Sequence, residues 1–288
     1  MARDAWPRLR LVDSHAHLQS EAFAGDADEV LAAAHAAGVE RLLIPAWDLP
    51  STHAGLAFVR RHGLRTTAGI HPHLARDVDE ETWEQVRALA AEPEVAGIGE
   101  TGLDYDRAFS PRDDQLANLR RHVELARVVA KPLILHCRSK PGQRDAQDDL
   151  IAELRAGGVG EREWRVRFGD RPSGVLHSFS GAVDFAEAAL DMGLAIAFGG
   201  LVFRRGEEAS AQVAAIVPPR RLLIETDSPY LKPRGVRGSR NEPRHVAVTA
   251  AWLLELRGDD PDAFGRALIE TFDRFVGVGL AADGLASG

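Results

Sequence analysis

The chain has 288 residues, of which 45% are hydrophobic and 27% are charged, and its formal net charge is −8. This composition is ordinary for a soluble globular protein, and no apolar run approaches the ~18 residues of a membrane span. The first residues lack the apolar segment of a secretory signal, and a single cysteine, Cys137, excludes an internal disulfide. We therefore expect a cytoplasmic protein without membrane contact. The negative charge argues against nonspecific nucleic-acid binding by the whole surface, but not against a local positive site.

Short apolar runs alternate with segments of helical periodicity along the chain. Strands are predicted near 9–12, 41–46, 65–70, 95–100, 133–136, 174–177, 194–198 and 221–226. Helices are predicted over 27–37, 82–91, 114–129, 147–156, 183–192, 210–216, 242–256 and 262–275, and less regularly over 51–61. The strands are apolar without strict alternation, which is typical of a parallel sheet buried on both faces. Eight strand–helix units in this length predict an α/β fold, a (β/α)8 TIM barrel.

The chain shows no interdomain linker, so we predict a single domain over residues 1–288. An open doubly wound sheet is the competing fold, but no glycine-rich phosphate fingerprint follows the first strand. The interval 157–172 is rich in Arg, Glu and Gly and is predicted to be an insertion before the sixth strand. The Gly/Ala-rich tail, 277–288, is predicted to be loosely ordered.

Polar side chains gather where the predicted strands end. His15 and His17 follow the first strand and leave the same face of it, because a strand has a side-chain period of two. Further polar residues follow other strands: His71, His73, Glu100, Asp104, His136, Arg138, His177 and Asp227. Each has a structural alternative, such as a solvated or hydrogen-bonded core histidine or a turn cap. Since the carboxyl ends of barrel strands meet at one face, their recurrence predicts a metal-binding active site there.

These residues lie within sequence blocks whose order and spacing are distinctive. The blocks are DSHAHL, GIHPH, GIGETGLDYD, LILHCR, HSFSG, LLIETDSPYL and RNEP. They resemble the TatD family of metal-dependent deoxyribonucleases, from about Val12 to Phe275. The resemblance implies that one divalent ion is ligated by His15, His17, Glu100 and Asp227, and that Glu100 bridges to a second ion held by His136 and His177. The chain departs from the family pattern at Ser139–Lys140, in the interval 157–172 and at Asp273, which puts substrate preference in question.

We predict two-metal phosphodiester hydrolysis, in which Asp227 orients or deprotonates a water and Glu100 bridges the ions. The ligand types suit Mg²⁺, Mn²⁺ or Zn²⁺, and the resemblance favours Mg²⁺ or Mn²⁺ for nuclease activity. It implies a 3′→5′ exodeoxyribonuclease that acts on single-stranded or damaged DNA, and we expect a monomer. The competing hypothesis is a D-aminoacyl-tRNA deacylase or another ester or amide hydrolase, because the same site could activate an acyl carbonyl. A noncatalytic scaffold is the third hypothesis, but it predicts missing ligands.

Six residues are predicted to contact the substrate or to support the metal ligands: His71, His73, Asp104, Arg138, Arg204 and Asn241. Arg138 could hold two phosphate oxygens, with a salt bridge as its alternative role. Arg204 could meet a nucleic-acid backbone, with a solvated loop position as its alternative. Two late loops, at 204–205 and 232–244, also concentrate positive charge. Their importance depends on whether they surround the site.

Overall fold

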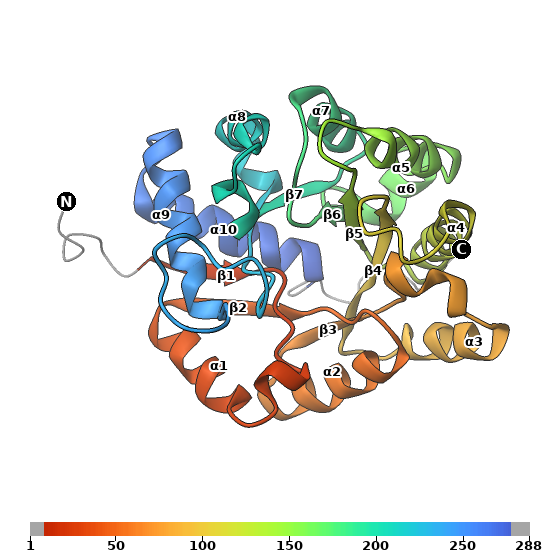
Figure 1. The fold of residues 1–288 in the computed structure, drawn as a ribbon, viewed down its shortest axis with the longest axis horizontal. Helices are drawn as coiled ribbons and strands as arrows, with labels where there is room; N and C mark the ends of the chain where they lie inside the picture. The colour runs from red at the N-terminus through yellow and green to blue at the C-terminus, as the bar shows by residue number, and fades with distance from the viewer. Residues whose placement is uncertain (1–8, 278–288) are drawn as a thin grey trace.

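A computed structural model describes residues 9–277, and Figure 1 shows them as a barrel of strands surrounded by helices. Eight strands form one sheet in the order of the chain, and each pairs in parallel with the next. They are β1 (Leu11–Asp13), β2 (Val39–Ile44), β3 (Arg65–Ala68), β4 (Val95–Asp104), β5 (Leu133–Arg138), β6 (Gly174–Leu176), β7 (Ala195–Phe198) and β8 (Leu222–Ile224). The Ser14 amide donates to the Ile224 carbonyl at 3.0 Å and closes β1 on β8. The predicted TIM barrel is confirmed.

Helices cover the outside of the barrel (Figure 1). They are α1 (Ala27–Ala36), α2 (Leu49–His62), α3 (Glu80–Leu89), α4 (Arg112–Val129), α5 (Asp145–Ala156), α6 (Arg162–Phe168), α7 (Val183–Asp191), α8 (Glu208–Ile216), α9 (Val246–Arg257) and α10 (Pro261–Val276). Short 3-10 turns include η3 (Pro72–Asp77) and η4 (Gly200–Phe203), which follow β3 and β7. None of the helices within residues 9–277 combines the length and apolar character needed to cross a bilayer.

Local signals explain where helix α2 begins and ends. The side chain of Asp48 accepts the Ser51 amide at 2.7 Å, which satisfies one of the free N–H groups of the first turn. Gly63 ends the helix in the left-handed conformation, which glycine adopts without a steric penalty. The segment expected to be irregular is therefore a regular helix with both ends capped.

Strand β4 is longer than the prediction, which ended it at Glu100. It continues to Asp104, because residues 101–104 pair with the second half of β5. Gly102 makes this possible: a Cβ there would lie 2.0 Å from the His136 carbonyl oxygen. The two backbones approach closely only without a side chain at this position, and the extension carries Asp104 beside His136.

The interval 157–172 contains helix α6, whose Trp164 and Phe168 are buried with their rings stacked at 5.3 Å. The interval is thus attached to the barrel by an apolar contact of its own. Its description as an insertion relative to the family stays a prediction. Of the tail predicted to be loosely ordered, residues 278–288 lie outside the described residues.

Candidate metal centre

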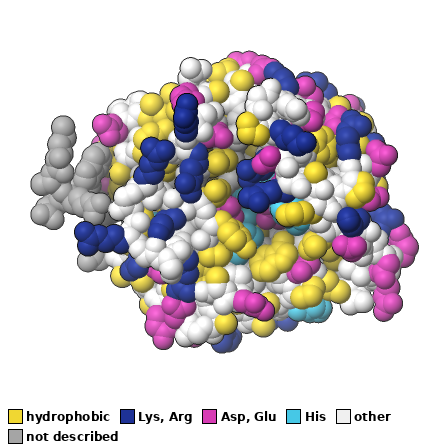
Figure 2. All heavy atoms as spheres, viewed as in Figure 1, with side chains coloured by type: hydrophobic (Ala, Val, Ile, Leu, Met, Phe, Trp, Pro, Cys, Tyr) yellow, Lys and Arg dark blue, Asp and Glu magenta, His cyan; other side chains and the backbone are white. Residues whose placement is uncertain are grey.

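A wide pocket opens at the carboxyl ends of the strands, and five of the six predicted ligands line it, with His15 buried beside them. Histidine, carboxylate and cationic side chains from the ends of β1, β3, β4, β5, β6 and β8 all reach it. Figure 2 looks into this hollow, where histidine atoms lie between an apolar area and a cluster of Lys and Arg. The strand-end residues that the sequence singled out therefore meet in one place, as the barrel topology requires.

The first ligand group consists of His15, His17, Asp227 and one oxygen of Glu100. The Nε2 atoms of His15 and His17 lie 3.2 Å apart. His15 Nε2 is 3.2 Å from Glu100 Oε2, and His17 Nε2 is 3.4 Å from Asp227 Oδ1. All four side chains are buried or nearly so. The spacing of His15 and His17 does place both imidazoles on one side of the chain.

The second ligand group consists of His136, His177 and the other oxygen of Glu100. Glu100 Oε1 is 2.9 Å from His177 Nε2 and 3.2 Å from His136 Nδ1. These two nitrogens lie 3.2 Å apart. Glu100 therefore directs one carboxylate oxygen to each ligand group, which is the arrangement that a bridging carboxylate requires.

Both groups fit a divalent cation by their chemistry and spacing. Imidazole nitrogens and carboxylate oxygens bind such ions at about 2.0–2.2 Å, so adjacent ligand atoms lie ~3–3.6 Å apart. Three of the separations between ligand atoms in the first group are 3.2–3.4 Å. Burial raises the pKa of Glu100, but the facing imidazoles of His177, His71 and His15 outweigh it and hold that pKa well below its usual range. The Glu100 carboxylate is therefore ionised, as a metal ligand must be.

The hydrogen bonds of the other ring nitrogens show which histidines can bind a metal. His17 Nδ1–H donates to the Pro45 carbonyl at 3.1 Å, which leaves the Nε2 lone pair free. His177 Nδ1–H faces Glu225 Oε1 at 3.3 Å, and His136 Nε2–H faces Asp104 Oδ2 at 3.3 Å. In each case the nitrogen within the ligand group is the unprotonated one. These outer contacts fix the tautomer and the ring orientation that metal binding needs.

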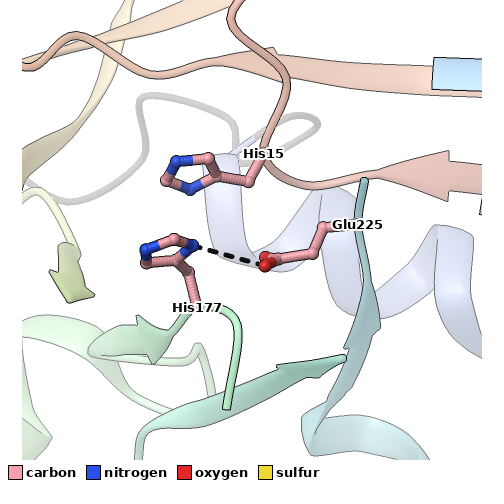
Figure 3. Close-up of side chains that lie close together, drawn as sticks. All are labelled: His15, His177 and Glu225. Atoms are coloured by element: carbon pink, nitrogen blue, oxygen red, sulfur yellow. Dashed lines mark hydrogen bonds and ion pairs between the residues drawn. The ribbon is translucent and has the colours of Figure 1, made fainter. Parts of the chain in front are cut away.

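Glu225 is a site residue that the sequence analysis did not assign. Figure 3 shows it beside His177, with the imidazole of His15 stacked on that of His177 at 3.9 Å between ring centroids. Glu225 is fully buried, and its Oε1 also accepts the Ser178 amide at 2.6 Å. A signal was present, since Glu225 and Asp227 repeat the one-residue spacing of His15 and His17.

His71 differs from the ligand histidines. Its Nδ1 accepts the His73 amide at 3.1 Å, so the hydrogen of the neutral ring is on Nε2. Burial lowers the pKa of His71 to about 4, which keeps the ring neutral at neutral pH. Its Nε2 lies 3.2 Å from Glu100 Oε1. His71, in the pocket lining, thus points an N–H donor, not a lone pair, at Glu100 Oε1.

Asp104 connects His73 with the second ligand group. Its Oδ2 lies 2.7 Å from His73 Nε2, and its Oδ1 accepts the amides of Asp106 and Arg107. Burial raises the pKa of Asp104, but hydrogen bonds from His136 and His73 hold it well below its usual range. Asp104 is placed to orient His136, which is one of the two roles proposed for it from sequence.

The other three predicted contacts occupy different surroundings. Arg138 lines the pocket and forms an ion pair with Asp106 at 2.8 Å. Arg204 is exposed beyond the pocket lining, which includes its neighbour Arg205 instead. Asn241 is fully buried and donates to the Thr226 carbonyl at 2.8 Å, so it supports the loop that carries Asp227.

Aromatic side chains form part of the pocket rim. Trp47 and Tyr230 lie beside His17, at 5.2 and 6.1 Å between ring centroids, and Phe109 lies 4.8 Å from His73. Tyr230 and Phe109 are 60% and 56% exposed, which is unusual for aromatic rings without a partner to cover them. The sequence analysis did not select Trp47, although it directly follows the apolar residues of the second strand.

Comparisons with known proteins agree with this centre. The family model described as TatD related DNase matches residues 12–277. The chain is 38% identical over 264 residues to the "3'-5' ssDNA/RNA exonuclease TatD" of Erwinia billingiae, covering 89% of this chain and 95% of the relative. It is 34% identical over 248 residues to the metal-dependent hydrolase YabD of Bacillus subtilis, covering 86% and 91%.

A solved structure extends the likeness to three dimensions. The crystal structure of YJJV, a TatD homologue from Escherichia coli, superposes with a TM-score of 0.80 at 28% identity, covering 94% of this chain and all of that chain. Family model, relatives and fold agree over nearly the same residues, and the pocket holds a ligand set of the matching kind. The chain therefore belongs to the TatD family and is a metal-dependent hydrolase.

Proposed function

We propose that this hydrolase is a 3′→5′ exonuclease that cleaves single-stranded or damaged DNA with two divalent ions, Mg²⁺ or Mn²⁺, with Zn²⁺ as a further candidate. The observation that carries the proposal is the position of Glu100, whose two oxygens face separate ligand groups. Paired ions bridged in this way suit in-line cleavage of a phosphodiester. The printed name of the Erwinia relative supports a nucleic-acid substrate. All ligands come from one chain, which fits activity as a monomer.

The bound ions would supply the positive charge that acidifies a water and offsets charge on the phosphoryl group. Asp227 then has a second role in addition to its role as a metal ligand. Burial raises its pKa, but the facing imidazoles, that of His17 above all, keep that pKa below its usual range, so the carboxylate is ionised. An ionised carboxylate at this position can orient the attacking water and accept its proton.

His71 supplies a different element of the proposed reaction. Its neutral ring, in the pocket lining, directs Nε2–H at Glu100 Oε1. A donor held in a buried place stabilises charge that develops on a phosphoryl oxygen, because it needs no reorganisation during the reaction. The half-buried Trp47 and the exposed Tyr230, both in the pocket lining, offer stacking surfaces for the unpaired bases next to the cleaved bond.

End-labelled oligonucleotides test the proposed function. Protein freed of metal and then supplied with Mg²⁺, Mn²⁺ or Zn²⁺ should shorten single-stranded DNA from its 3′ end, and D-aminoacyl-tRNA should stay intact. Asp227→Asn should lower turnover by about 10²-fold or more, because the amide cannot accept a proton. Asp184→Asn is the matched control on the pocket rim and should retain activity. Inertness toward DNA with all three metals, or hydrolysis of the tRNA ester instead, would contradict the proposal.

A further inference from the structure

Two loops beside the pocket carry positive charge that the proposed reaction does not use. The loop after β7 contains Arg204 and Arg205, and the loop after β8 contains Lys232, Arg234 and Arg237. Neither stretch, 199–206 or 231–241, contains an aspartate or glutamate. We call these five side chains the loop cluster. Such a concentration stands out in a chain whose net charge is −8.

The two loops touch each other at the edge of the pocket. A Cβ on Gly200 would lie 1.6 Å from the Leu231 carbonyl oxygen, so the two backbones are in direct contact and require glycine there. Arg205 and Leu231 both line the pocket. Figure 2 shows dark blue side chains gathered on the face that surrounds the hollow. The loop cluster therefore begins at the pocket mouth and extends away from it.

The charges of the loop cluster are free of carboxylate partners within residues 9–277, where none of the five side chains forms an ion pair. Neighbouring cations are paired: Arg240 with Asp26, and Arg244 with Glu242. At the end of β5, Arg138 of the pocket lining is likewise paired with Asp106. Cations that are not paired internally remain available to an anionic ligand without first breaking a salt bridge.

We propose that the loop cluster binds the phosphodiester backbone of the polynucleotide, a few nucleotides away from the end that occupies the pocket. This inference rests on the proposed nuclease function. Guanidinium and ammonium groups that form no internal ion pair suit a ligand with one negative charge per nucleotide, and binding releases the counterions of the strand. Contacts of this kind hold the strand in place without reading its bases. The loop cluster thus favours long strands over dinucleotides.

The test replaces Arg204, Arg234 and Arg237 together by glutamine, since these three side chains are exposed and lie outside the pocket lining. Binding of a labelled twenty-nucleotide single strand is measured in EDTA, where it does not depend on turnover. The triple variant should bind about tenfold more weakly, and the dependence of log K on log salt should become shallower by about 2, at ~0.7 per phosphate contact. With metal present, KM for the long strand should rise while cleavage of a dinucleotide stays unchanged.

The matched control replaces Arg155, Arg162 and Arg266, three exposed arginines outside the pocket lining, by glutamine. It removes the same charge and should leave binding and the salt slope close to those of the wild type. Unchanged binding in the first variant, or equal weakening in the control, overturns the inference. Failure of the proposed function is seen separately, as wild-type protein that cleaves neither substrate. The binding measurement decides the role of the loop cluster in that case as well.

Discussion

The two ligand groups are similar in chemistry but are held in place by different means. In the first group, His17 is oriented by a backbone carbonyl, and the Asp227 amide donates to the His15 carbonyl at 2.9 Å. In the second, His136 and His177 are oriented by the side chains of Asp104 and Glu225. Backbone groups of the barrel thus orient ligands of the first group, whereas the carboxylates of Asp104 and Glu225 orient the histidines of the second group.

This difference has a consequence for metal binding. A carboxylate that accepts the second N–H of an imidazole increases the basicity of the ligand nitrogen and restrains the ring. Substitution of Asp104 or Glu225 can therefore tune the second group, whereas the outer ring nitrogen of His17 in the first group meets a backbone carbonyl that no substitution removes. Glu100 belongs to both groups and should be the position of greatest effect.

Replacement of Glu100 by glutamine should remove the carboxylate that supplies one oxygen to each of the two ligand groups. The amide offers one oxygen, and its NH2 group cannot bind a cation, so at least one ion should be lost. We expect turnover to fall by about 10³-fold, equivalent to ~4 kcal/mol of transition-state stabilisation. Elemental analysis of the purified protein and oligonucleotide cleavage measure the two effects. Glu124→Gln, an exposed surface change, is the control, and a Glu100→Gln protein with two tightly bound ions would refute the bridging role.

Substitution of His71 tests whether this residue, beside the second ligand group, is a metal ligand or a hydrogen-bond donor. Because its Nε2 carries the hydrogen, His71→Ala should leave the metal content unchanged and lower kcat by about 10²-fold, the usual effect of losing one donor to developing charge. His71→Gln keeps an N–H group near the same position and should recover part of the loss. Metal content and kcat, measured on the same preparations, distinguish the two roles. Loss of one ion from His71→Ala would identify His71 as a ligand and disprove the donor role.

Asp104→Asn and Glu225→Gln test the contrast between the two ligand groups directly. Each should weaken the affinity of the second ion by about 10–100-fold, which is the usual effect of losing such a partner. The affinity of the first ion should change little, because Pro45 and the chain backbone orient that group. A calorimetric titration of metal-free protein with Mn²⁺ measures the two affinities separately. Equal weakening of both ions would show that the two ligand groups are not independent.

The sequence predicted those parts of the centre that follow from strand geometry. A side-chain period of two placed His15 beside His17, and the common edge of parallel strands brought Glu100, His136 and Asp227 together. These relations depend on the topology alone, so short patterns were sufficient. The same reasoning predicted the barrel from eight apolar runs, and the structure confirms it.

Other features depend on packing between distant segments. Glu225 follows β8 and contacts His177, which follows β6, and no local pattern specifies which strand-end side chains meet. The tautomer of His71 depends on one backbone amide in the η3 turn. Residues 101–104 continue β4 because they pair with β5, although glycine weakens the strand signal there. Trp164 and Phe168, four residues apart, carried a helical signal for α6 that was obscured by the polar composition around them.

The smallest predicted effect is that of His122, on α4, on the pH dependence of the free energy of unfolding. Once it is known, the contribution of the histidines in the two ligand groups can be measured separately. Burial lowers its pKa to about 4, and its ring accepts the Ile70 amide and donates to the Asn118 carbonyl. The unfolded chain takes up this proton near pH 6.5 and the folded chain does not. The contribution of His122 to stability is therefore complete above pH 6.5 and is lost as the pH falls from 6.5 toward 4.

Between pH 7.5 and 5.5 this histidine should reduce the free energy of unfolding by about 1.4 kcal/mol, a tenfold change in the unfolding equilibrium. His122→Gln should be less stable at pH 7.5 but should lose correspondingly less stability on acidification. Urea unfolding in EDTA at both pH values measures the difference without a contribution from metal binding. An identical pH dependence in the two proteins would mean that the folded state does not lower the pKa of His122. The acid sensitivity that remains in the variant then belongs to the other titrating groups, among them the two ligand groups, whose histidines face carboxylates, whereas the ring nitrogens of His122 bond to backbone groups alone.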